Sequence, residues 1–224
     1  MIIALDADGG DYAPREVVKG AAQAAAEYGI DIALIGKKAI LEMLVRRYGK
    51  KRKFTIIEAS QTIECNEPPV QAVRSKPDSA IVIGTKLVKE GTASAFVSAG
   101  STGAVLAAAF LHLGRIKGVQ RPALCGIIQL QPENPVLLID VGANVDCRPE
   151  HLVQFGQLGA TFAREFLYIE APKVGLLNNG AEEVKGNQLA KESFQHLKNA
   201  NLNFIGNVEG QDILSKKADV VVTD

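Results

Sequence analysis

The sequence has little of what defines several broad classes of protein. Its 224 residues include only three cysteines, Cys65, Cys125 and Cys147, and none of them forms a CxxC pair. An odd number of scattered cysteines argues against a disulfide framework and against a zinc knuckle. We therefore expect reduced thiols in a cytoplasmic protein, and we expect neither a metal ion nor a cofactor.

An excess of one charge is also missing. The chain has 25 basic and 25 acidic residues, so it lacks the basic surface that would neutralise a nucleic acid backbone. Its longest mainly apolar stretch, Gly103–Leu113, is far shorter than the roughly 20 residues that span a bilayer. The start, MIIALDADGGD, lacks the pattern of a signal peptide. Nucleic acid binding, membrane spanning and export are not expected.

Short β-branched runs alternate with Ala-rich helical patterns, which predicts an α/β fold with a mainly parallel sheet covered by helices on both faces. Strands are predicted at Ile2–Asp6, Asp31–Gly36, Phe54–Glu58, Ala95–Ala99, Val136–Asp140, Lys173–Asn178, Asn203–Asn207 and Asp219–Thr223. Helices are predicted at 14–28, 37–48, 80–89, 101–113, 149–167 and 186–199. Ala123–Gln131 is predicted as a further strand, either parallel or antiparallel.

No repeat, low-complexity tract or long linker interrupts the chain, so we predict a single domain over residues 1–224. The sequence stops directly after its last predicted strand, with no helix to follow it. We therefore expect a C-terminally truncated domain.

Five of the predicted strands end in loops that are rich in Gly, Asn and Asp. In open α/β sheets, ligands bind at the carboxyl ends of the strands, so loops of this kind predict a polar binding site. The loops are Asp6–Asp11, Ser98–Gly103, Asp140–Asp146, Asn178–Asn187 and Gly206–Gly210.

The loop Ser98–Gly103 lies between a predicted strand and a predicted helix. Its glycines allow backbone N–H groups to approach an anion, and the helix N-terminus favours negative charge. The spacing matches neither GxGxxG nor GxxxxGK[ST], which argues against dinucleotide binding and Walker-type phosphoryl transfer. A capped turn with Ser101 as N-cap is an equally good interpretation. The substrate-binding candidates are Ser98, Gly100, Ser101, Thr102 and Gly103, together with Asp6, Gly9 and Gly10 of the first loop.

Four polar residues in the later loops are candidates for catalysis. The ammonium group of Lys185 would neutralise a bound phosphate, although a solvated lysine at a helix start fits equally well. Asn144, Asp146 and Asn207 lie at strand ends and could orient substrate or stabilise an oxyanion. Helix caps and turns use the same residue types, so each alone is a weak signal.

Cys147 offers a different chemistry. It precedes the helix that is predicted to begin at Pro149, where a thiolate would be favoured, and His151 could act as its base. An inert packed cysteine is the more common alternative.

Together, these loops closely resemble the phosphate acyltransferase family of bacterial phospholipid synthesis, the acyl-ACP:phosphate acyltransferases known as the PlsX family. The segments that carry the resemblance are Asp6–Pro14, Phe96–Ala104, Leu113–Gly118 with Arg121–Ala123, Gly142–Phe155, Val174–Asn178 with Lys185–Asn187, and Asn203–Gly210. The family usually has Met at the position of Asp8 and Asn at that of Ser101.

This resemblance implies transfer of a fatty acyl group from acyl carrier protein to inorganic phosphate, as the first step toward phosphatidic acid. It also implies an isopropylmalate-dehydrogenase-like α/β/α fold, which the phosphotransacetylases share. A homodimer, peripheral association with the inner face of the cell membrane, and delivery of the product to glycerol-3-phosphate acyltransferase are further implications. Two alternatives remain: an acyl-CoA:phosphate transferase, and a non-catalytic scaffold that binds phosphate or acyl phosphate.

Overall fold

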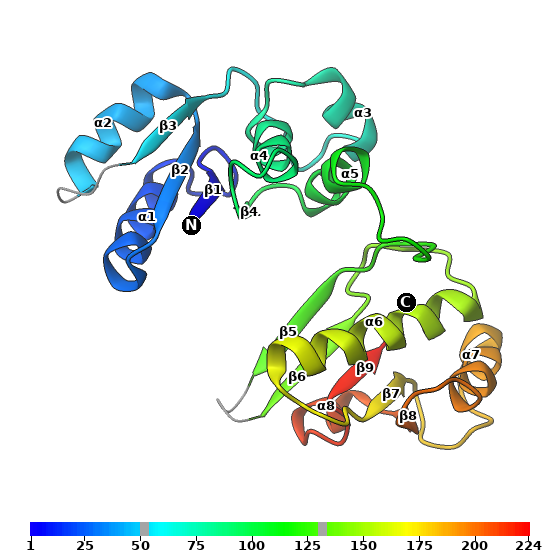
Figure 1. Cartoon of the computed structure of the whole chain (residues 1–224). Helices are drawn as coiled ribbons and strands as arrows, with labels where there is room; N and C mark the ends of the chain where they lie inside the picture. Colours follow the sequence, from blue (N-terminus) through cyan, green and yellow to red (C-terminus); the bar gives the residue numbers. More distant parts are fainter. Residues whose placement is uncertain (50–53, 130–133) are drawn as a thin grey trace. The chain divides into compact units, whose positions relative to one another are not determined.

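The computed structural model describes residues 1–49, 54–129 and 134–224 (Figure 1). The chain divides into two compact units, Met1–Gly114 and Arg115–Asp224, which we call unit 1 and unit 2. Each unit has its own sheet.

Unit 1 contains a four-stranded parallel sheet in the order β3-β2-β1-β4. Its strands are β1 (Ile2–Asp6), β2 (Asp31–Gly36), β3 (Thr55–Glu58) and β4 (Ala95–Val97). Its helices are α1 (Arg15–Tyr28), α2 (Lys38–Tyr48), α3 (Pro69–Ser75), α4 (Ala80–Lys89) and α5 (Thr102–His112).

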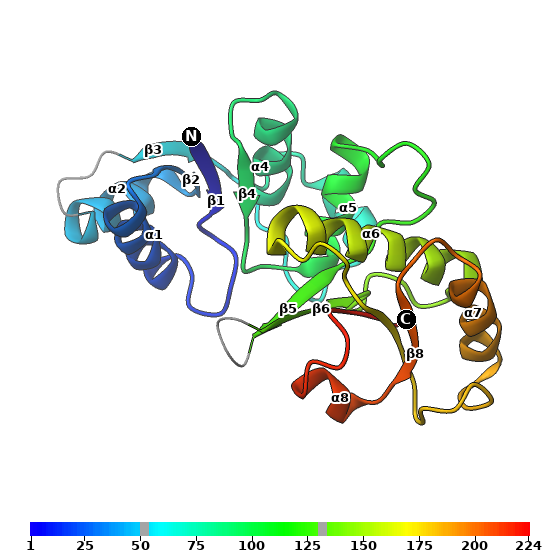
Figure 2. The same cartoon turned by 60° about the horizontal axis from the view of Figure 1, so that its bottom comes forward.

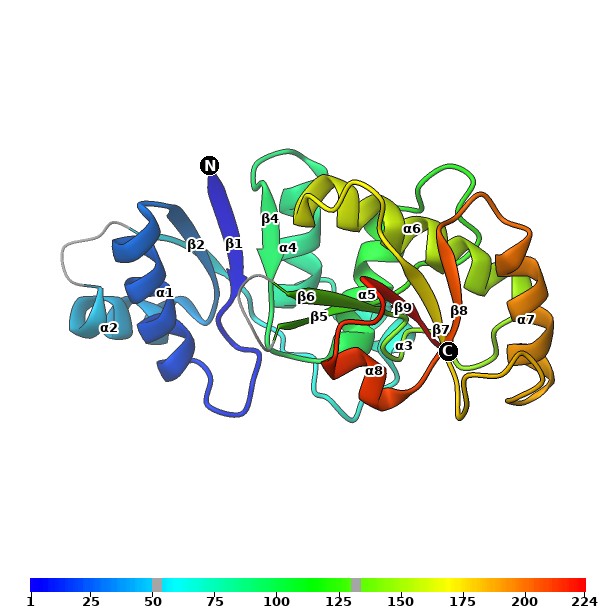
Figure 3. The same ribbon diagram turned by 90° about the horizontal axis from the view of Figure 1, so that it is seen from below.

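Successive side chains of a strand point to opposite faces of the sheet, and in unit 1 both faces are covered. Leu34 of β2 packs with Val18 and Leu41 from α1 and α2. Its neighbour Ile35 packs on the other face with Ala80 of α4. Figure 3 shows α1 and α2 on one side of the sheet and α4 on the other, so unit 1 has three layers.

Unit 2 contains a five-stranded sheet in the order β5-β6-β9-β7-β8, in which only β5 is antiparallel to its neighbour. Its strands are β5 (Cys125–Gln129), β6 (Pro135–Ile139), β7 (Val174–Leu177), β8 (Phe204–Val208) and β9 (Val220–Val222). Its helices are α6 (Pro149–Leu167), α7 (Gln188–Lys198) and α8 (Gly210–Leu214).

The sheet of unit 2 is also covered on both faces. Phe155 of α6 is buried against Leu137 and Val220, in a cluster that includes α7. On the other face Val221 packs with Ile213 of α8. Figure 2 shows α6 and α8 on opposite sides of this sheet.

The predicted α/β class with a mainly parallel sheet is confirmed. All eight main predicted strands are present, and Ala123–Gln131 contains the antiparallel strand β5; its last two residues lie outside the described residues. The predicted helix 80–89 is α4. The short helices α3 and α8 were not predicted, because seven and five residues are too few to show helical periodicity. The single domain stays a prediction.

Two helical glycines allow a matched test of packing in these layers. A Cβ at Gly159 of α6 would lie 2.5 Å from a methyl group of Val220, whereas a Cβ at Gly20 of α1 would meet nothing within 4 Å. We expect Gly159→Ala to lower the free energy of unfolding by about 1–3 kcal/mol through overpacking. Gly20→Ala should raise it by about 1 kcal/mol, because alanine restricts the unfolded chain. Urea denaturation followed by circular dichroism measures both, and equal stabilisation by the two changes would contradict the close approach of α6 to β9.

Candidate functional site

The carboxylate of Asp6 connects two of the predicted loops in unit 1. It lies at the carboxyl end of β1 and is buried. Its Oδ1 accepts hydrogen bonds from the backbone N–H groups of Asp8 and Gly9, both at 3.0 Å. Its Oδ2 accepts a hydrogen bond from the hydroxyl of Ser98 at 2.7 Å, and Ser98 Oγ in turn accepts one from the N–H of Gly100 at 3.0 Å. One side chain therefore holds the loops after β1 and β4 together.

Glycine is required where these two loops meet. A Cβ on Gly9 would lie 2.4 Å from Asp6 Oδ2 and 2.8 Å from the backbone nitrogen of Gly100. Gly10 has a φ of 107°, a conformation that residues with a side chain rarely adopt. Asp6, Gly9, Ser98 and Gly100, all predicted as substrate-binding candidates, thus form one cluster, which we call the double loop.

Ser101 has the capping role that was one of its two interpretations. It is buried, and its hydroxyl oxygen accepts a hydrogen bond from the N–H of Ala104 at 3.3 Å as the N-cap of α5. Among the described residues, no hydrogen bond engages the N–H groups of Thr102 and Gly103. Because these groups open an 11-residue helix, they remain available to an anion.

Asp8 adds a second, half-buried carboxyl group beside the double loop. Its Oδ2 is buried without a hydrogen-bond partner among the described residues. Burial and then the neighbouring Asp6 carboxylate raise the pKa of Asp8, while Lys37 acts in the opposite direction. Burial also raises the pKa of Asp6, against the lowering effect of its hydrogen bonds with Ser98, Asp8 and Gly9. The folded chain therefore holds a proton on Asp8 more tightly than the unfolded chain does.

This shift predicts a pH dependence of stability. An acid with a raised pKa in the folded state stabilises the fold below its unfolded pKa of about 4, and this stabilisation is lost as the pH rises through the folded pKa. We expect Asp8→Asn to raise the melting temperature at pH 7, and we expect the gain to shrink as the pH falls toward about 4. Asp11→Asn, an exposed change in the same loop, is the control. A gain from Asp8→Asn that does not change with pH would show that its charge is not the cause.

In unit 2, Asp140 organises the loop after β6 in the way that Asp6 organises the loop after β1. It is buried, and its Oδ1 accepts hydrogen bonds from the N–H groups of Leu124 and Ala143, at 2.9 and 3.0 Å. Its Oδ2 accepts hydrogen bonds from both the backbone and the side-chain N–H of Asn144, each at 2.8 Å. Asp140 was not among the predicted site residues, although its position between a strand and Gly142 was a usable signal.

The bonds of Asn144 change what this residue can do. Its side-chain NH₂ donates to Asp140 and also, at 2.9 Å, to the carbonyl oxygen of Pro122, so both of its hydrogens are engaged. Asn144 therefore holds the loop in place, and it could donate to an oxyanion only after one of these bonds breaks. Asp146 is exposed, and its backbone oxygen accepts a hydrogen bond from Arg121 at 3.1 Å.

Two asparagines hold the loop that carries Lys185. Asn178, at the end of β7, donates to the carbonyl oxygen of Lys185 at 3.1 Å, and Asn207 of β8 donates to that of Glu182 at 2.8 Å. Gly186 has a φ of 88°, and a Cβ there would lie 2.6 Å from Asn178 Oδ1. The side chain of Lys185 is exposed and forms no ion pair within the described part of the chain. Its charge is free for a ligand.

The surroundings of Cys147 do not activate it. Burial, with the nearby acidic groups of Asp224 and Asp140, raises the pKa of the Cys147 thiol. His151 is buried, and its Nδ1 accepts a hydrogen bond from the N–H of Arg148 at 3.1 Å. Burial and two nearby arginines, Arg121 and Arg148, lower the pKa of His151. His151 thus caps α6, and the structure favours the inert interpretation of Cys147.

The described residues contain no group of three or more His, Cys, Asp or Glu side chains that could hold a metal ion. Over the same parts of the chain, no helix is both long and apolar enough to cross a membrane.

Solved structures define the class of fold. A phosphotransacetylase from Staphylococcus aureus matches 99% of this chain and 77% of its own, with a TM-score of 0.66 and 18% identity. A branched-chain phosphotransacylase from Enterococcus faecalis V583 matches 99% of this chain and 79% of its own, with a TM-score of 0.63 and 17% identity. The chain therefore has the α/β fold of the phosphotransacylases.

Relatives in sequence define the family. A phosphate acyltransferase from Dehalococcoides mccartyi is 57% identical over all 224 residues, and one from Pelotomaculum thermopropionicum is 49% identical. The family described as "Fatty acid synthesis protein" matches residues 1–224, and the chain belongs to this family. The predicted resemblance to the phosphate acyltransferases is confirmed. The chain spans about 65% of the length of these two relatives.

Proposed function

We propose that this protein transfers a long-chain fatty acyl group from acyl carrier protein to inorganic phosphate. The observation that carries the proposal is the identity, over the whole chain, to relatives named phosphate acyltransferase. Two features of the chain support it: the free N–H groups of Thr102 and Gly103 behind the double loop, and the unpaired charge of Lys185.

In the proposed reaction, an oxygen of hydrogen phosphate attacks the carbonyl carbon of the thioester. A C–O bond forms, the C–S bond breaks, and the proton of the phosphate passes to the departing thiolate, which gives acyl phosphate and free carrier thiol. Phosphate is already anionic at neutral pH, so the protein mainly positions the reactants and stabilises charge. We assign phosphate binding to the loop Ser98–Gly103 with Lys185, carbonyl polarisation to Asn207, and departure of the thiol to Asp146, with Asn144 as a positioning residue.

Direct attack predicts that Cys147 is dispensable. Because its thiol has a raised pKa and His151 is engaged as a cap, we expect Cys147→Ala to keep kcat/KM within about twofold of the unchanged protein. Mass spectrometry of the protein quenched during turnover should find no acyl group on Cys147. A trapped acyl-cysteine, together with loss of activity in Cys147→Ala, would contradict direct attack.

The phosphotransacylase fold favours one second candidate, transfer of an acyl group between coenzyme A and phosphate. Assays with palmitoyl-ACP and palmitoyl-CoA as alternative donors separate the two. We expect a higher kcat/KM with palmitoyl-ACP, and a clear preference for palmitoyl-CoA would favour the second candidate. Binding of acyl-ACP or phosphate without turnover of either donor would favour a non-catalytic scaffold.

The family resemblance supports the remaining parts of the proposal. They are a cytoplasmic homodimer at the inner face of the cell membrane, and delivery of acyl phosphate to glycerol-3-phosphate acyltransferase on the way to phosphatidic acid.

A further inference from the structure

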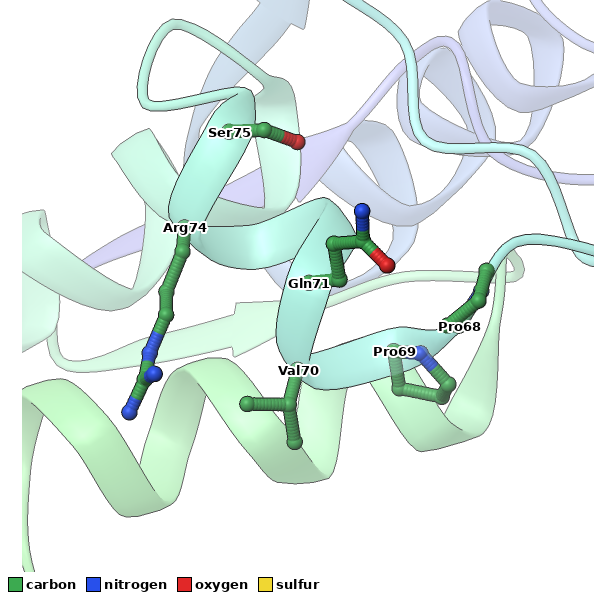
Figure 4. A pocket seen from close by; sticks show the side chains of 6 residues that line it. All are labelled: Pro68, Pro69, Val70, Gln71, Arg74 and Ser75. Atoms are coloured by element: carbon green, nitrogen blue, oxygen red, sulfur yellow. The ribbon is translucent and has the colours of Figure 1, made fainter.

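Helix α3 of unit 1 borders an open groove that has no assigned part in the reaction proposed for this protein. The groove has a volume of about 610 Å³, and its lining residues are Pro68, Pro69, Val70, Gln71, Arg74 and Ser75. Its apolar part is exposed, since Val70 keeps 51% of its surface accessible. Val70 and Arg74 are one helical turn apart, and Figure 4 shows their side chains on the same side of α3.

The groove begins beside Gly103, which lies at the start of α5, three residues after Gly100 of the double loop. Helix α3 packs along α5, and a Cβ on Gly103 would lie 2.8 Å from Pro69. Gly103 therefore allows the wall of the groove to approach the anion-binding N–H groups closely. A ligand that reaches the double loop through this groove would pass over Pro69 and Val70.

The far end of the groove carries a free positive charge. Arg74 lies five residues after Pro69, about 7.5 Å further along the helix axis. Its guanidinium is exposed and forms no hydrogen bond or ion pair within the described residues. Glu67, which precedes α3, is paired with Lys76. Arg74 is therefore available for an anion outside the protein.

These features describe a linear ligand with an uncharged middle part, one end at the double loop and an anionic group at the other. We propose that the groove binds the phosphopantetheine arm of the acyl carrier protein, with its phosphate on Arg74 and its thioester directed toward the double loop. This inference rests on the proposed function, because that function supplies an acyl thioester as donor. The main support for the proposal is the complementary charge of Arg74, because a planar guanidinium suits a phosphate diester.

The test measures binding to the 224-residue chain by titration calorimetry, without turnover. The probes are octanoyl-phosphopantetheine and octanoyl-pantetheine, which lacks the phosphate. We expect octanoyl-phosphopantetheine to bind about tenfold more tightly than octanoyl-pantetheine, which corresponds to the free energy of one charge-assisted hydrogen bond. Arg74→Ala should abolish this difference. Val70→Asp should weaken both probes about tenfold, because it places a charge in the apolar part of the groove. The matched controls on α2 are Arg46→Ala and Met43→Asp, both exposed changes in the same unit.

Equal binding of the two probes by the unchanged chain, or a preference for the phosphorylated probe that persists in Arg74→Ala, would overturn the proposal. So would a loss of binding in the two control variants. Failure of the proposed function is a separate result: it would appear as absence of acyl transfer while octanoyl-phosphopantetheine still binds in an Arg74-dependent way.

Discussion

Replacing Lys185 with alanine is expected to lower kcat/KM for phosphate-dependent thioester cleavage by about 100-fold, which corresponds to about 2.7 kcal/mol. The side chain is exposed, and its loop is held by backbone contacts with Asn178 and Asn207 rather than by the ammonium group. The loop should therefore keep its structure in the variant. The loss should be largest in the KM for phosphate, because the charge binds the anion before the reaction begins.

Lys191→Ala is the matched control for this prediction. Lys191 is also exposed, and it lies on α7, which follows the same loop. Replacement of Lys191 should leave kcat/KM within about twofold of the unchanged protein. Both variants should have the melting temperature of the unchanged protein. Equal activity of Lys185→Ala and Lys191→Ala would show that Lys185 does not bind phosphate.

Asp6→Ala is expected to have the largest effect on stability, a loss of about 3 kcal/mol in the free energy of unfolding, together with loss of phosphate binding. The change leaves three donors without their acceptor: the N–H groups of Asp8 and Gly9 and the hydroxyl of Ser98. An unsatisfied buried donor costs about 1–3 kcal/mol, and part of the cost is recovered when water enters. Chemical denaturation and phosphate titration measure the two effects.

Asp31→Ala, at the exposed start of β2, is the control for this change, and Asp6→Asn is a milder variant. The amide oxygen of Asn can still accept the two backbone N–H groups, so Asp6→Asn should lose less stability than Asp6→Ala. If Asp6→Ala is as stable as Asp31→Ala and binds phosphate normally, the double loop does not depend on this carboxylate.

Local patterns in the sequence predicted the architecture well. The β-branched runs predicted the strands, because such side chains suit a buried pleated surface, and Ala-rich periodicity predicted the long helices. The helix α3, which borders the groove, was missed because it has only seven residues. The two-unit division was not predicted, since no linker composition separates residues 114 and 115.

The candidate site was predictable only as a set of loops. The sequence indicated which loops carry polar residues, but the bond between Asp6 and Ser98 joins positions 92 residues apart and depends on the pairing of β1 with β4. Competition between partners was also hidden: Asn144 has the right chemistry for an oxyanion donor, yet both of its hydrogens are engaged by Asp140 and Pro122. Such bonds depend on tertiary geometry, which residue types and spacing do not specify.

Transfer of radiolabelled inorganic phosphate into product in the presence of palmitoyl-ACP would show whether phosphate is the acyl acceptor. We predict a labelled acyl phosphate that hydroxylamine destroys, formed in equal amount to the free carrier thiol and strongly reduced in Lys185→Ala. Release of thiol without labelled product would instead show hydrolysis of the thioester, and it would contradict the proposal that phosphate is the acyl acceptor.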